Sequence, residues 1–109
     1  MSNLLKSIID FIDSKKGEDI KVLDFQRHSP FIDYFVIVSA LNNRHALSLI
    51  DDLEDFANKN DLIVNSKDAI KDSNWMLIDI NNIVVHVFVG EDRDKYNLEG
   101  LWKDLVIQN

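Results

Sequence analysis

Two short β-favouring segments joined by a pair of asparagines constrain the fold more than any other feature of this sequence. Residues 76–80 and 83–89 are rich in β-branched and other apolar side chains, and only Asn81 and Asn82 separate them. Asparagine tolerates positive φ better than most residues, so the pair suits a two-residue hairpin turn. A turn of this length fixes the register of the two strands and places alternate residues on opposite faces. The sequence therefore predicts an antiparallel hairpin whose cross-strand pairs can be named.

The two predicted faces of this hairpin differ in polarity. One face consists of aliphatic pairs and is expected to pack on helices: Ile80 with Ile83, Ile78 with Val85 and Met76 with Val87. The other face mixes polar, aromatic and apolar pairs: Asp79 with Val84, Leu77 with His86 and Trp75 with Phe88. This mixed face is either a partly wet surface or a second, smaller core under the C-terminal segment. Both descriptions can hold, because residues of an interface are often anchored by packing.

The rest of the chain alternates between helical and strand patterns. Helical spacing of apolar residues marks three segments: residues 3–16, a segment that Asn42 or Asn43 would cap, and residues 98–105. Strand patterns mark residues 19–25, 33–40 and 62–64, followed by a polar loop over residues 67–74. The segment 33–40 is almost continuously apolar, so we expect it to be covered on both faces. The order of elements predicts one α/β domain over residues 1–109, with about five strands.

Charge and hydropathy exclude several classes of protein. Nineteen acidic residues against twelve basic ones give a formal charge of −7. This balance argues against DNA binding or any affinity that depends mainly on nucleic-acid phosphates, and it favours a basic protein partner. No apolar run approaches the roughly 18–20 residues that span a bilayer, and Lys6 and Asp10 interrupt the N-terminal apolar residues where a signal peptide would be continuous. We therefore expect a cytoplasmic chain without membrane contact.

The residues that catalysis or cofactor binding would need are largely missing. The chain has no cysteine, which excludes thiol catalysis and thiolate metal sites, and its three histidines lack metal-ligand spacing. No glycine-rich phosphate-binding motif is present. Metal-dependent phosphoryl transfer would require a second carboxylate two residues after Asp33 or Asp79, where the chain has Phe35 and Asn81. The sequence predicts a protein that is not an enzyme and holds no cofactor.

An ordered series of residues carries a family resemblance. The series comprises Trp75, Asp79, residues 84–88, Arg93 and finally Tyr-Asn-Leu-Glu-Gly-Leu-Trp at residues 96–102. Upstream, residues 33–38 followed by Arg44 and His45 continue the same pattern. From about Asn3 to Asp104 the chain resembles the ribosomal silencing factor family, also called the Iojap-like family.

The resemblance implies both a fold and a function. The fold would be an α/β domain related to nucleotidyltransferases, with a mixed sheet flanked by helices. Members of the family are not known as enzymes; they bind the large ribosomal subunit through ribosomal protein L-fourteen on its inter-subunit face. Docking there sterically blocks the small subunit and silences translation when nutrients are scarce. The family also forms homodimers, and minor contact with ribosomal RNA phosphates from Arg44 or Lys103 stays open for this chain.

The expected partner-binding residues lie on the mixed face and in the segment that follows it: Trp75, Asp79, His86, Arg93, Tyr96, Glu99 and Trp102. For each residue the alternative is a role in the fold, and this alternative is strongest for Trp102 and His86. Two other functions stay open. One is a minimal nucleotidyltransferase, which the missing carboxylate pair and phosphate loop disfavour. The other is an acidic adaptor for a different basic partner, which would not discriminate between the ribosomal subunits.

Overall fold

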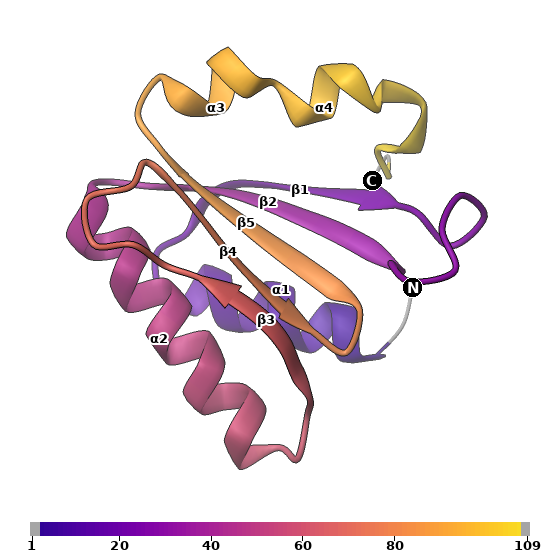
Figure 1. Cartoon of the computed structure of the whole chain (residues 1–109), viewed down its shortest axis with the longest axis horizontal. Coiled ribbons are helices and arrows are strands. Elements are labelled where there is room, and N and C mark those ends of the chain that lie inside the picture. The colour runs from indigo at the N-terminus through magenta and orange to yellow at the C-terminus, as the bar shows by residue number, and fades with distance from the viewer. Residues whose placement is uncertain (1–2, 108–109) are drawn as a thin grey trace.

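The computed structural model describes residues 3–107 of the chain and shows one five-stranded sheet with helices on both faces (Figure 1). The strands are β1 (Glu18–Asp24), β2 (Tyr34–Ala40), β3 (Val64–Asp68), β4 (Trp75–Ile80) and β5 (Ile83–Val89). The helices are α1 (Asn3–Ser14), α2 (Asn43–Lys59), the short α3 (Asp92–Tyr96) and α4 (Leu98–Leu101), and the 3-10 helix η1 (Lys103–Leu105). The expected single α/β domain with about five strands is confirmed, although residues 1–2 and 108–109 of its predicted range lie outside the described residues.

The sheet is mixed, as the resemblance implied. Its strand order is β1-β2-β5-β4-β3, and only the central pair β2 and β5 is parallel. This parallel pair sets Val36 beside Val85 and Val38 beside Val87. The long helix α2 makes the crossover between β2 and β3, and the side chain of Asn42 caps it by accepting a hydrogen bond from the His45 N–H at 2.8 Å. Asn42 is thus the cap among the two asparagines that the sequence offered.

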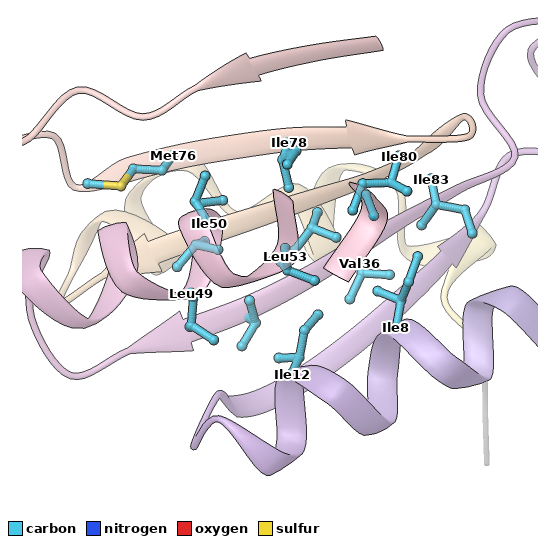
Figure 2. Close-up of a cluster of buried hydrophobic side chains, with 14 of the residues drawn as sticks. Ile8, Ile12, Val36, Leu49, Ile50, Leu53, Met76, Ile78, Ile80 and Ile83 are labelled. Atoms are coloured by element: carbon cyan, nitrogen blue, oxygen red, sulfur yellow. The ribbon is translucent and has the colours of Figure 1, made fainter. Parts of the chain in front are cut away.

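The larger core lies between the sheet and the pair α1 and α2 (Figure 2). Ile8 and Ile12 of α1 point toward the sheet, and Leu49 and Leu53 of α2 pack beside them (Figure 2). The sheet contributes buried apolar side chains to this core, including Val36, Met76, Ile78, Ile80 and Ile83. Burial of each such side chain contributes about 1.5–3 kcal/mol, so this layer supplies most of the stability.

Across residues 3–107, no helix combines the length and apolar character that crossing a membrane demands.

The predicted hairpin is confirmed in its turn and its register. Asn81 and Asn82 adopt φ values of 49° and 70°, the left-handed conformation that the two-residue turn needs. Ile80 pairs with Ile83, and every further predicted pair follows in register. Asn81 also accepts a hydrogen bond from the Ile63 N–H through its side chain at 2.7 Å, which ties the turn to the segment before β3.

The third strand differs from the prediction. It runs over Val64–Asp68 rather than residues 62–64, so the first two residues of the predicted polar loop are strand. The alternation was obscured because β3 is an edge strand with polar side chains. Lys67, which pairs with Ile78, turns toward α2 and donates hydrogen bonds to Asp51 and Glu54 at 3.0 Å each. An ion-paired lysine therefore occupies a position on the sheet face that β4 fills with apolar side chains such as Ile78.

The single C-terminal helix predicted over residues 98–105 is wrong. Asn97 adopts φ 45°, which separates α3 from α4, and its side chain accepts a hydrogen bond from the Gly100 N–H at 3.1 Å. Trp102 then ends α4 and η1 follows. Leu98 and Leu105 pack on the second core as their spacing predicted, but Leu101 is exposed, and two short pieces, α4 and η1, replace the single helix.

Candidate functional site

The sheet face turned away from α1 and α2 carries three of the seven predicted site residues, Trp75, Asp79 and His86. We call it the second face; its residues are Phe35, Ile37, Ser66, Asp68, Trp75, Leu77, Asp79, Val84, His86 and Phe88. The segment α3–α4–η1 crosses this side of the sheet (Figure 1). Leu98, Leu105 and Val106 pack there on Leu23, Ile37 and Phe88. The segment covers only part of the face, because Leu77 and Asp79 of β4 stay half-buried and Ser66 and Asp68 of β3 are exposed.

Both descriptions of the mixed face therefore apply to different parts of it. Around Phe25, Ile37 and Phe88 it is a second, smaller core. Around the outer half of β4 it is a surface. Trp75 stands on the boundary, half-buried against Phe88 at a ring-centroid distance of 5.0 Å.

His86 holds Trp75 in place. The Trp75 indole N–H donates to Nδ1 of His86 at 3.1 Å, and the Phe35 ring lies edge-on to the imidazole with centroids 4.5 Å apart. An indole nitrogen only donates, so Nδ1 is unprotonated and Nε2 carries the proton. His86 is 5% exposed, and this burial lowers its pKa to about 4. The neutral imidazole is thus part of the fold, and its role is to orient the tryptophan.

Tyr96 completes an aromatic cluster with Trp75 and Phe88. Its ring centroid lies 4.7 Å from that of Trp75 and 6.3 Å from that of Phe88. Tyr96 is 45% exposed, whereas Phe88 is fully buried. Tyr96 and Trp75 therefore present an aromatic surface to solvent, and the buried Phe88 ring packs beneath them.

Arg93 and Glu99 lie together, but their charged groups bind each other rather than facing solvent. Arg93 is only 6% exposed; its Nε and Nη2 donate to the two carboxylate oxygens of Glu99 at 3.3 and 3.4 Å. Its Nη1 donates to Ser39 Oγ at 2.8 Å and lies 3.7 Å from an Asp19 carboxylate oxygen. The guanidinium joins α3 and α4 to the end of β2, so it positions the segment that carries Tyr96.

Asp79 and Trp102 lie apart from the aromatic cluster. Asp79 accepts one long hydrogen bond from the Asn65 side chain, at 3.4 Å. Trp102 is 41% exposed and contacts the Phe25 ring edge-on at 5.4 Å, beyond the end of β1. The structure therefore spreads the seven predicted residues over the second face and the segment that crosses it.

Two carboxylates were missed by sequence reasoning. Asp68 and Asp92 line a hollow beside the aromatic cluster together with Ser73, Asn74, Trp75, Leu77 and Tyr96. Asp68 was assigned to a loop, and nothing in the local sequence around Asp92 distinguishes it from the acidic residues on either side. Within the described part of the chain, no three histidine or carboxylate side chains gather closely enough to hold a metal ion.

The family model and the curated relatives that match this chain point to the same family. The sequence model of the family described as ribosomal silencing factor during starvation matches residues 1–109. A curated relative, ribosomal silencing factor RsfS of Bacillus subtilis, is 33% identical over 102 residues, which are 94% of this chain and 86% of the relative. The chloroplastic protein Iojap of Zea mays is 33% identical over 84 residues, covering 77% of this chain and 36% of that protein.

Solved structures agree with the fold. A crystal structure of a protein from Bacillus halodurans superposes with a TM-score of 0.82 at 27% identity, covering 97% of both chains. Protein CV0518 from Chromobacterium violaceum superposes with a TM-score of 0.85 at 24% identity, covering 94% of this chain and 88% of that one. The second likeness concerns the fold alone.

Proposed function

Because this chain belongs to the family of ribosomal silencing factors during starvation, we propose that it represses translation by docking on the large ribosomal subunit. In this proposal the contact is ribosomal protein L-fourteen on the inter-subunit face, and the bound protein sterically blocks the small subunit. The action is non-catalytic, takes place in the cytoplasm and needs no cofactor. The family description supports a regulatory role and association with ribosomes.

One observation supports the second face as the docking surface. Trp75 and Tyr96 present an aromatic surface to solvent while His86 and Phe88 hold it from beneath. Aromatic side chains anchored in this way are the usual centres of binding energy in protein interfaces. The opposite sheet face is covered by α1 and α2, so its side chains are buried.

The seven predicted residues divide into two groups under this proposal. Those that retain accessible surface contact the partner directly: Trp75, Asp79, Tyr96 and Trp102. Those engaged within the chain position the first group: His86, Arg93 and Glu99. The negative net charge steers the chain toward a basic ribosomal protein. Exposed Arg44 and Lys103 add minor contacts to ribosomal RNA phosphates, and off the ribosome the second face supports a homodimer.

Co-sedimentation with separated ribosomal subunits tests the proposal. The protein is expected to migrate with the large subunit alone at near-physiological salt, and isolated ribosomal protein L-fourteen is expected to compete for it. Subunits incubated with the protein should reassociate less. Migration with both subunits, or with neither, would contradict the proposal and favour an adaptor for another basic partner.

A further inference from the structure

A surface hollow is lined by residues from the end of β3, the loop that follows it, β4 and α3, beside the aromatic cluster. Its volume is about 350 Å³, enough for one large side chain. Its lining combines an aromatic wall, Trp75 and Tyr96, with two carboxylates, Asp68 and Asp92. This combination restricts the chemistry of an occupant.

The aromatic wall offers ring surface rather than hydrogen-bond donors. The Trp75 indole N–H is already used by His86, and the Trp75 and Tyr96 rings meet at 44° with centroids 4.7 Å apart. The Tyr96 ring also interacts with a cation in the chain itself, since Nζ of Lys95 lies 5.6 Å from its centroid. Electron-rich ring faces of this kind attract cations.

The two carboxylates carry charge that the chain does not neutralise. Neither the Asp68 carboxylate nor the Asp92 carboxylate forms a hydrogen bond or ion pair with any other residue in the range 3–107. By contrast, Asp19, Asp51 and Asp52 are all paired with basic side chains. Asp68 is exposed beside Leu77, with which it pairs, and Asp92 is half-buried in the first turn of α3. The rim of the hollow is thus negative on two sides.

We propose that this hollow receives an arginine side chain of the protein partner, with the guanidinium against the Trp75 and Tyr96 rings and its N–H groups donating to Asp68 and Asp92. The proposal rests on the proposed function and names the group recognised at that site. A guanidinium is planar, stacks on aromatic rings and is more weakly hydrated than an ammonium group. Its five donors can also serve two carboxylates at once, which a lysine does less well.

Other occupants fit the lining poorly. An apolar side chain would use the rings but would remove two unpaired carboxylates from water without compensation. An anion would be repelled by both carboxylates. Arginine satisfies the wall and the rim together better than lysine does.

Binding of carboxamide variants to the large ribosomal subunit tests the two carboxylates. Asp68→Asn and Asp92→Asn keep side-chain size and remove one charge each, and we expect each to weaken binding about tenfold. Asp94→Asn is the matched control, because it removes the same charge from the same short helix at an exposed position outside the hollow. The control is expected to bind within twofold of the unchanged protein. Equal binding by all three variants, whether weakened or not, would overturn the proposal.

An NMR titration without ribosomes separates this inference from the proposed function. The chain has two tryptophans, so argininamide should shift the indole N–H signal of Trp75 while that of Trp102 serves as an internal reference. The shift should saturate at a lower concentration with argininamide than with lysinamide, and it should disappear in the Asp68→Asn/Asp92→Asn double variant. Equal responses to both amides would overturn the arginine site. A saturating response from a chain that does not bind the large subunit would uphold the site and reject only the ribosomal partner.

Discussion

The two faces of the sheet are built from the same strands but differ in polarity and in exposure to solvent. The face toward α1 and α2 is mostly aliphatic and buried, and polar side chains on it, such as those of Lys67 and Tyr34, form hydrogen bonds. On the second face several buried polar groups are matched to specific neighbours, as Trp75 is to His86 and Arg93 is to Glu99, while Nε2 of His86 has no hydrogen-bond partner among the described residues. The comparison teaches that apolar burial gives this domain its stability, whereas matched polar contacts give it a shaped, accessible surface.

Strand β4 belongs to both regions. Met76 and Ile78 point into the larger core, and Trp75, Leu77 and Asp79 alternate with them on the second face. Substitutions one residue apart should therefore separate stability from binding. The predictions below are ordered by their expected effect on stability.

Ile78→Ala should cause the largest loss of stability. Ile78 is fully buried, so truncation removes apolar contacts and leaves a cavity, which typically costs about 2–5 kcal/mol. Leu77→Ala, on the half-buried second face, should cost about 1 kcal/mol while weakening ribosome binding. Urea denaturation measures both changes. Equal destabilisation by the two variants would contradict the division between the faces.

Acidification should destabilise the protein through His86. Its pKa is lowered to about 4 in the folded state, against about 6.5 when unfolded, so between these values the unfolded chain binds more protons. The stability from the neutral imidazole is therefore complete above pH 6.5 and is lost as the pH falls toward 4, by up to about 3 kcal/mol.

The variant His86→Gln isolates this effect. Glutamine can still accept a hydrogen bond from Trp75 but does not titrate. Unfolding free energies measured between pH 4 and pH 7 should fall less steeply with acid for the variant than for the unchanged protein. Identical slopes would show that the histidine does not stay neutral in the fold.

Arg93→Ala should loosen the segment that crosses the second face. It leaves Glu99 without its bidentate partner and Ser39 without its donor, a loss of about 2 kcal/mol given that Glu99 is partly exposed. Limited proteolysis should cut residues 91–107 faster, and urea denaturation should show the loss. Asp94→Ala, from the exposed side of α3, is the control and should change neither measurement.

Asp79→Arg should have the smallest effect on stability and a large effect on binding. Asp79 makes one long hydrogen bond and is half-buried, so we expect a change within about 0.5 kcal/mol. The reversed charge would face a basic partner and should abolish binding to the large subunit. A large fall in the thermal midpoint would place Asp79 in the fold instead.

Local patterns predicted much of this fold because the interactions concerned are local. The turn at Asn81 and Asn82 fixes the hairpin register, and period-two alternation then assigns each residue of β4 and β5 to a face. The break at Trp102 was missed because apolar spacing does not report whether one continuous helix carries the spaced residues.

The candidate site was predicted only in part. Trp75 and His86 are diagonal neighbours across one hairpin, so sequence reasoning placed them on the same face. Tyr96 and Asp92 reach the same place through the path of α3, which Arg93 sets by contacts with β2 and β1. Such contacts join distant parts of the chain, and periodicity carries no information about them.

Site-specific photo-crosslinking tests the central claim most directly, which is that the second face and not the helical face meets the ribosome. A benzophenone amino acid would replace exposed Tyr96 in one variant and Asn58, an exposed position on α2, in another. After illumination with large ribosomal subunits, we predict crosslinks from position 96 to ribosomal protein L-fourteen and none from position 58. Crosslinks from position 58 alone would contradict the account and assign docking to the acidic surface of α2.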